Sequence, residues 1–145
     1  MKTSVTALGP AAAAVFAALH ADCFTDPWSE TAMAALLSSP GVTGLVLQAA
    51  GAPAGMALVR AVLDEAEILT IGVIPGARRS GCGARLVTAC AHAARAAGCR
   101  TVFLEVSQTN TAAAALYARA GFTETGRRAG YYSDGSDARL MALEL

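Results

Sequence analysis

Two arginines and two glycines, in the order Arg78-x-x-Gly81-x-Gly83, follow a short apolar run in the middle of the chain. The run, 68–74, is rich in β-branched residues and is stopped by Pro75, so it predicts a buried strand. A helix with one apolar side follows the glycines. Because a strand, a glycine-rich turn and a helix N-terminus direct several backbone N–H groups to one point, the pattern indicates an anion site, typically for a phosphate.

The two glycines have a second interpretation, a flexible turn followed by a helix cap. Taken alone, R-x-x-G-x-G is a weak signal, and the turn is an equally good explanation. Glycine inside a helix costs about 1 kcal/mol relative to alanine, which favours a close approach of another group to the backbone. The dinucleotide fingerprint G-x-G-x-x-G and the Gly-Lys-Ser/Thr of a P-loop are both absent from the sequence. The binding interpretation therefore depends on the rest of the chain.

The composition bounds the class of protein. A chain of 145 residues fits one domain, 1–145, large enough to bury about 70% of its unfolded surface. The formal net charge is zero, which argues against a nucleic-acid partner. The charge is uneven, however, because residues 1–70 carry a net of −4 and residues 71–145 a net of +4. Either the two halves attract each other, or one half holds an anionic ligand and the other a cationic one.

The cysteines and the hydropathy pattern exclude further classes. Cys23, Cys82, Cys90 and Cys99 form no C-x-x-C pair and have no histidine at metal-ligand spacing, so no metal site is expected. They read as the reduced thiols of a cytoplasmic protein. No apolar run approaches the roughly 20 residues that span a bilayer, so we expect no membrane association.

The order of the expected elements predicts a mixed α/β (α+β) domain with one sheet. A strand at 101–106 follows the glycine-rich loop and its helix, and such a crossover makes it parallel to the strand at 68–74. Trp28 lies between two helices, as a lid on the core or as a ligand contact. The remaining expected elements are a strand at 3–8, helices at 11–23 and 29–38, a hairpin of 42–48 and 55–63 joined by a turn at 49–53, a helix from Asn110 to 120, and a hairpin of 122–132 and 137–145.

Three motifs in this order resemble those of the GNAT superfamily of acetyl-CoA-dependent N-acetyltransferases. They are the loop from Arg78 to Gly83, the run LEVSQTN at 104–110, and the run ALYARAGF at 115–122. Pro27-Trp-Ser-Glu30 adds a likeness to the RimI family, which acetylates the N-terminal amine of a ribosomal protein. The resemblance covers nearly the whole chain. It implies the GNAT fold, a central mixed sheet of about seven strands with four helices, splayed at the acetyl-CoA site.

The resemblance also implies how acetyl-CoA is bound. The strand at 71–73 would pair with the pantetheine arm, and the loop at 79–84 would wrap the pyrophosphate, with charge from the two arginines. Asn110 would contact the cofactor, although a plain helix cap explains it equally well. The implied cofactor-binding set is Ile71, Gly72, Val73, Arg78, Arg79, Ser80, Gly81, Cys82, Gly83, Ala84 and Asn110.

Two residues match the family's catalytic groups. An amine must be neutral to attack a thioester, and the pKa of an α-amine is about 7.7–8.0, so a base is useful. Glu105 matches this base, and Tyr117 matches the acid that protonates the departing thiolate. The alternatives are that Glu105 pairs with an arginine or lies exposed on its strand, and that Tyr117 belongs to an apolar helix face. Glu67, on the strand before the loop, is the alternative base.

The acceptor is inferred from the family and from charge. Trp28, Glu30 and Tyr131 would line the acceptor groove, and acidic residues nearby would favour a basic protein N-terminus, as in a ribosomal protein. Two alternatives remain: an acetyltransferase acting on a small amine, an amino acid or a lysine side chain, and a non-catalytic acyl-CoA-binding module. We expect a monomer or weak dimer.

Overall fold

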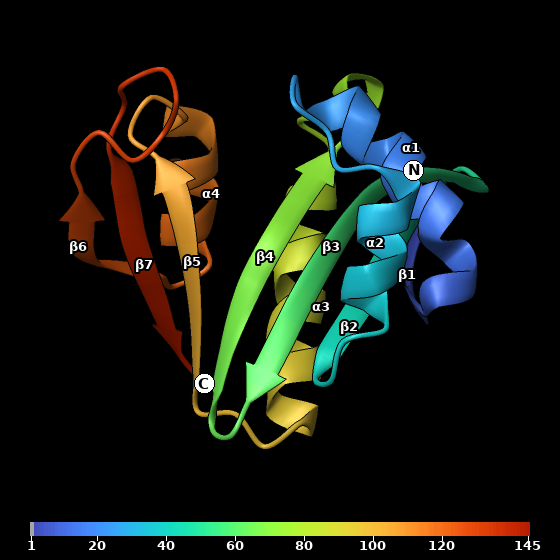
Figure 1. The fold of residues 1–145 in the computed structure, drawn as a ribbon, viewed down its shortest axis with the longest axis horizontal. Coiled ribbons are helices and arrows are strands. Elements are labelled where there is room, and N and C mark those ends of the chain that lie inside the picture. Colours follow the sequence, from blue (N-terminus) through green and yellow to red (C-terminus); the bar gives the residue numbers. More distant parts are fainter. Residues whose placement is uncertain (1) are drawn as a thin grey trace.

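Seven strands form one sheet in the order β1-β2-β3-β4-β5-β7-β6 in the computed structural model, which describes residues 2–145 (Figure 1). This confirms the mixed sheet expected from the sequence. The strands are β1 (Thr3–Leu8), β2 (Val42–Ala49), β3 (Ala52–Val62), β4 (Glu65–Val73), β5 (Thr101–Ser107), β6 (Thr123–Arg128) and β7 (Ala138–Glu144). The α-helices are α1 (Ala13–Cys23), α2 (Glu30–Leu37), α3 (Cys82–Ala96) and α4 (Thr111–Arg119), and short 3-10 helices cover Pro10–Ala12 and Pro75–Ala77.

The two faces of the sheet carry two separate cores. On one face α1 and α2 pack on β2 and β3 through Phe16, Met33, Met56 and Leu58, all fully buried. On the other face α3 and α4 cover the sheet, and α3 lies behind β3 and β4 in Figure 1. No helix among residues 2–145 is long and apolar enough to cross a bilayer.

The helix boundaries follow local signals in the sequence. Ser29 caps α2 by accepting a hydrogen bond from the Ala32 N–H, as expected for an N-cap serine. Asn110 caps α4 in the same way. Gly98 has a φ of +87° just after α3, which is the left-handed conformation that ends many helices. These predictions are confirmed.

The sheet divides between β4 and β5. The two strands are parallel, as predicted, but they pair only from Glu65↔Thr101 to Glu67↔Phe103. Beyond this point they diverge, and Figure 1 shows the widening gap between them. The sheet therefore opens in its middle, where its unpaired strand ends can contact a ligand.

Strand β4 contains a bulge at Leu69. Thr70 is opposite Leu58 and Ile68 is opposite Val59, which leaves Leu69 as the extra residue. Three residues further along β4, a Cβ at Gly72 would lie 3.0 Å from the side chain of Cys23. The glycine allows the end of α1 to pack on β4.

The β2–β3 turn is shorter than predicted. It consists of Ala50 and Gly51 with φ values of +52° and +81°, so the strands extend into the region expected to be a longer turn. Two-residue turns with both φ values positive match the right-handed twist of a hairpin, which explains the tight connection.

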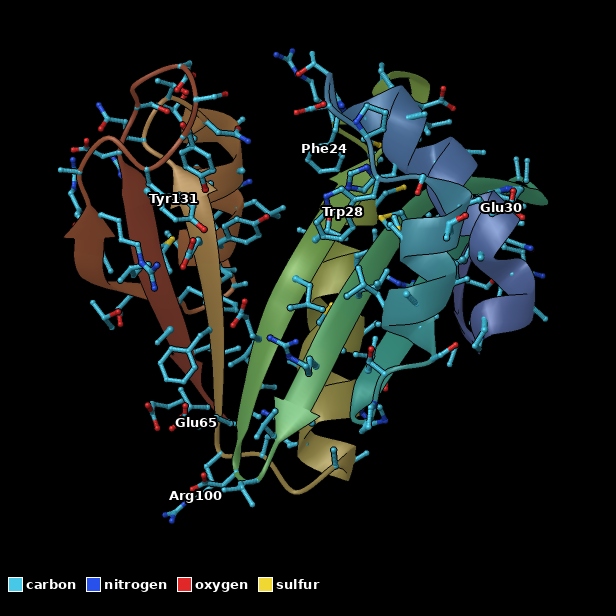
Figure 2. All side chains as sticks on the ribbon, viewed as in Figure 1. Phe24, Trp28, Glu30, Glu65, Arg100 and Tyr131 are labelled. Atoms are coloured by element: carbon cyan, nitrogen blue, oxygen red, sulfur yellow. The ribbon has the colours of Figure 1, made fainter. Side chains whose placement is uncertain are left out.

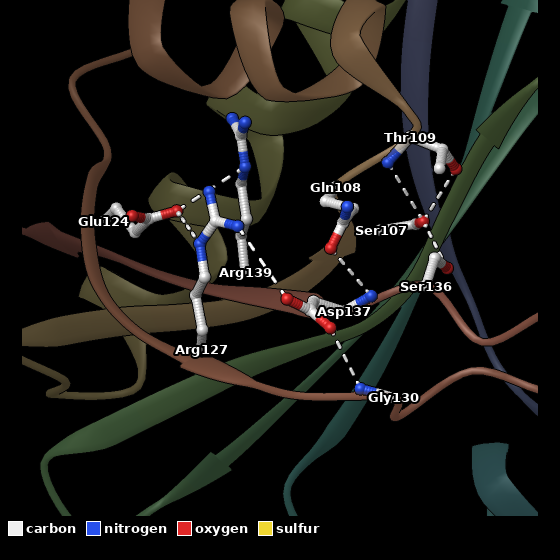
Figure 3. A network of polar contacts seen from close by, with 9 residues as sticks. All are labelled: Ser107, Gln108, Thr109, Glu124, Arg127, Gly130, Ser136, Asp137 and Arg139. Atoms are coloured by element: carbon white, nitrogen blue, oxygen red, sulfur yellow. Dashed lines mark hydrogen bonds and ion pairs between the residues drawn. The ribbon is translucent and has the colours of Figure 1, made fainter.

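The last hairpin has a long structured loop. β6 ends at Arg128, four residues before the predicted end, and residues 129–137 form the connection. Side chains hold this loop: the Asp137 carboxylate accepts from the Gly130 N–H at 2.9 Å, and the Gln108 side chain accepts from the Asp137 N–H at 2.9 Å (Figure 3). Ser136 also bonds Ser107 at 3.0 Å. These side-chain bonds replace the strand ladder and fix the loop against the end of β5.

Candidate active site

A cavity of about 330 Å³ lies where β4 and β5 diverge. It is bounded by the α1–α2 loop on one side and by β5, α4 and the loop at 129–137 on the other. Phe24 and Trp28 lie on the β4 side of the gap in Figure 2, and Tyr131 lies across it. The lining residues are His20, Phe24, Asp26, Trp28, Ile68, Leu69, Thr70, Ile71, Leu104, Glu105, Val106, Ser107, Asn110, Tyr117 and Tyr132.

The loop before α3 presents unpaired backbone donors. Arg79 has a φ of +61° and Gly81 a φ of +82°, so the chain turns sharply into the helix. The Arg85 N–H is bonded to the Gly81 carbonyl at 3.1 Å, while the N–H groups of 79–84 donate to no acceptor within residues 2–145. Such a run of free donors at a helix N-terminus fits a pyrophosphate.

The loop side chains have different environments. Arg78 Nε donates to the Val73 carbonyl at 2.9 Å, so this arginine also ties the loop to the end of β4. The Cys82 side chain is buried, so only the backbone of this residue is available to a ligand. Gly83 lies inside the first turn of α3, and a Cβ there would meet Leu116 of α4 at 2.9 Å. Gly83 therefore serves helix packing, and a side chain at this position would disturb the α3–α4 contact.

Two further residues expected to contact the cofactor line the cavity. Ile71 lies on β4 just after the bulge, and Asn110 lies at the start of α4. The Asn110 side-chain oxygen accepts from the Ala113 N–H at 3.2 Å, so its capping role occupies the oxygen and leaves the amide N–H₂ as a donor. Gly72 and Val73 follow Ile71 on β4 but do not line the cavity.

Glu105 lies in the cavity wall on β5. Its side chain is 28% exposed, and its carboxylate is 3.4 Å from the Arg128 guanidinium of β6. Glu105 is therefore an arginine partner, and its carboxylate also lines the cavity, where the base interpretation requires it. Both side chains are partly exposed, so the pair contributes little to stability.

Tyr117 lines the same cavity from α4. Burial raises the pKa of its phenol to about 12, with smaller contributions from Cys90 and Tyr132. The hydroxyl has no hydrogen-bond partner within residues 2–145. The phenol is therefore protonated at neutral pH and is free to donate to a ligand.

Glu67 lies at a different place. Glu67 is exposed and occupies the last position at which β4 pairs with β5, opposite Phe103. It does not line the cavity. The structure thus brings Glu105 and Tyr117 to one cavity and leaves Glu67 outside its lining.

The α1–α2 loop is held by a histidine that the sequence reading missed. His20 is 3% exposed, and its Nδ1 accepts from the Trp28 N–H at 3.1 Å. Its ring stacks with Phe24 at 4.3 Å and with Trp28 at 4.8 Å between centroids. Burial lowers the pKa of His20, which favours the neutral ring that this bond requires. The signal available in the sequence was a histidine near the end of an alanine-rich helix.

The far wall of the cavity contains Tyr132 instead of Tyr131. Tyr131 is 51% exposed and packs edge-on against Tyr132 at 5.1 Å. The pKa of Tyr132 is raised by burial, by Glu105 and by Tyr131. Adjacent tyrosines of a loop point in different directions, and which one enters the cavity depends on the bonds that hold the loop.

Only part of the expected acidic groove reaches the cavity. Asp26 lines it, but Glu30 does not, and Figure 2 shows Glu30 far from the gap. Asp22 lies in a separate shallow groove on α1. Among residues 2–145, no group of three or more His, Cys, Asp or Glu side chains is arranged to hold a metal ion.

Comparisons with known proteins agree with this geometry. A family described as "Acetyltransferase (GNAT) family" matches residues 14–122. The "[Ribosomal protein bS18]-alanine N-acetyltransferase" of Escherichia coli is 39% identical over 124 residues, covering 82% of each chain. The "N-alpha-acetyltransferase RimI" of Mycobacterium tuberculosis is 37% identical over 145 residues, covering 95% of this chain and 90% of the relative. The crystal structure of the Escherichia coli ribosomal-protein-S18-alanine N-acetyltransferase superposes with a TM-score of 0.90 at 32% identity, covering 99% of this chain and 94% of that one.

Proposed function

Because the chain belongs to the acetyltransferase (GNAT) family, we propose that it transfers acetyl from acetyl-CoA to the N-terminal α-amine of a protein. We further propose that the acceptor is a basic ribosomal protein in the cytoplasm, by analogy with the acceptor in the names of its relatives. The observation that carries this proposal is the shared cavity of Glu105 and Tyr117 beside the diverging strands.

Acetyl-CoA would be held by the backbone. The free N–H groups of 79–84 and the N-terminus of α3 would bind the pyrophosphate, and Arg78 and Arg79 would add positive charge. The unpaired side of β4 at Ile71 would hold the pantetheine arm and bring the thioester into the cavity. Asn110 would donate to the same arm through its free amide.

The chemistry needs one base and one donor. The neutral nitrogen would attack the thioester carbonyl, Glu105 would take the proton that this nitrogen then releases, and the carbon–sulfur bond would break. The pKa of a thiol is about 8.5, below the value of about 12 for Tyr117. Because the phenol is the weaker acid, it would donate a hydrogen bond to the departing sulfur in the transition state without giving up its proton. The thiolate can then take its final proton from solvent.

The acetyl-CoA site can be tested with Arg79→Gly. Glycine is compatible with the positive φ at this position, so the variant should be at least as stable as the wild type. The loss of a charge beside the phosphates should weaken coenzyme A binding about tenfold, and less so at high salt. Calorimetric titration at two salt concentrations measures this. Arg95→Ala, an exposed arginine in the last turn of α3, is the matched control. Unchanged affinity in the glycine variant would place the phosphates elsewhere.

The acceptor can be tested by measuring thiol release with a panel of amines. We expect a peptide beginning Ala-Arg to react faster than one beginning Ala-Glu, and both to exceed small amines. Asp26 lines the cavity, so Asp26→Asn should narrow the difference between the peptides, while Asp22→Asn, in the separate groove, should not. Fastest release with a small amine would instead support a small-molecule acetyltransferase, and binding without release from any amine would support a non-catalytic module.

A further inference from the structure

The ion pair between Glu105 and Arg128 is supported by aromatic contacts at the edge of the cavity. The Arg128 guanidinium is 3.4 Å from the Glu105 carboxylate and 5.4 Å from the centroid of the Tyr131 ring. Tyr131 in turn packs on Tyr132, which lines the cavity. Arg128 is the last residue of β6, so the strand and these rings hold its charge beside Glu105.

The neighbouring arginine is directed elsewhere. Arg127 contacts Glu124 at 3.6 Å and Asp137 at 3.9 Å, in the network of Figure 3. Adjacent side chains of a strand point to opposite faces of the sheet, which explains the separation. Among residues 2–145, Arg128 is the one cation within ion-pair distance of Glu105.

The other titratable groups that line the cavity add no second positive charge beside Glu105 at neutral pH. Tyr117 and Tyr132 have raised pKa values and are neutral at pH 7. His20, from α1, has a lowered pKa. Asp26, on the α1–α2 loop, is the remaining carboxylate in the cavity wall and forms no ion pair with Arg128. The charge beside the proposed base is therefore set by Arg128.

We propose that Arg128 is a specificity-determining residue that acts through Glu105 and favours acceptors entering as neutral amines, hence protein α-amines over lysine side chains. This inference rests on the proposed function. A charged ammonium group must displace the guanidinium or lie beside a like charge, whereas a neutral amine can donate to Glu105 with the ion pair intact. At pH 7 about one α-amine in ten is neutral, against about one lysine side chain in 2,500.

The test compares a peptide beginning with alanine against an Nα-acetylated peptide with one lysine. For each peptide, kcat and KM are measured from pH 6.5 to 9.5 in the wild type, Arg128→Ala, Arg128→Lys and the control Arg127→Ala. We expect Arg128→Ala to reduce the preference for the α-amine in kcat/KM about tenfold at pH 7, chiefly through a lower KM for the lysine peptide. The preference should return in Arg128→Lys, and Arg127→Ala should retain it.

The pH profile adds a readout that a purely structural role would not change. In Arg128→Ala the KM values should rise less steeply as the pH falls, because the ammonium form now binds. An unchanged preference in Arg128→Ala, or an equal change in Arg127→Ala, would overturn the role of Arg128 in an active enzyme. A wild type that releases no thiol with either peptide would overturn the proposed function, and this inference with it.

Discussion

Replacing Glu105 with glutamine is expected to lower kcat about a hundredfold at pH 7, which is the usual contribution of a general base. The loss should shrink as the pH rises, because hydroxide can then take the proton that the attacking nitrogen releases. Stability should change little, since the ion pair that Glu105 forms with Arg128 is partly exposed. Steady-state kinetics from pH 6.5 to 9.5, with thermal unfolding alongside, measure both effects.

The matched control for this variant is Glu67→Gln. Glu67 is exposed at the closed end of the β4–β5 divergence and does not line the cavity, so its replacement should leave the pH profile unchanged. The reverse result, a loss that recovers at high pH in Glu67→Gln alone, would assign the base role to Glu67.

Tyr117→Phe is expected to lower kcat by a similar factor, about a hundredfold, while the affinity for acetyl-CoA stays constant. The change removes one hydroxyl with no partner among residues 2–145, so the α4 packing against Phe122 should survive. The loss should be independent of pH across the neutral range, because the phenol does not ionise there. Single-turnover kinetics and calorimetric titration with coenzyme A separate the two quantities.

The wild-type pH profile provides a second check on Tyr117. Burial raises the pKa of this phenol to about 12, so the protonated form that donates to sulfur persists below that value and is lost as the pH rises through it. We therefore expect no fall in kcat attributable to Tyr117 up to about pH 10. A descending limb near pH 8 that disappears in Tyr117→Phe would contradict this environment.

The order of the elements and the place of the motifs can be predicted from the sequence alone. Ser29, Asn110 and Gly98 mark helix ends through bonds to neighbouring residues or through a local backbone conformation. The crossover helix between β4 and β5 requires the two strands to be parallel. Signals of this kind act over a few residues or follow from chain connectivity, so they can be read without a structure. The sheet and its helices were predictable for that reason.

The roles of the glycines were less accessible. The sequence offers a ligand approach as one reason for Gly72 and Gly83, and in the structure a Cβ at these positions would also meet Cys23 and Leu116. A glycine shows that something comes close to the backbone, but the sequence does not say whether that is a ligand or another helix. Arg79 also has a left-handed backbone conformation, which arginine rarely adopts, so the residue type gives no sign of it.

The construction of the cavity, in contrast, depends on contacts between distant elements. Glu105 meets Arg128 across β7, His20 holds Trp28, and the loop bonds place Tyr132 in the cavity. The divergence of β4 and β5 after Glu67 likewise depends on how the two halves of the sheet are packed. These contacts join residues on different elements, and their geometry depends on strand register and loop packing. Local patterns in the sequence place a residue on its element, but the partner it meets is set by how the elements pack.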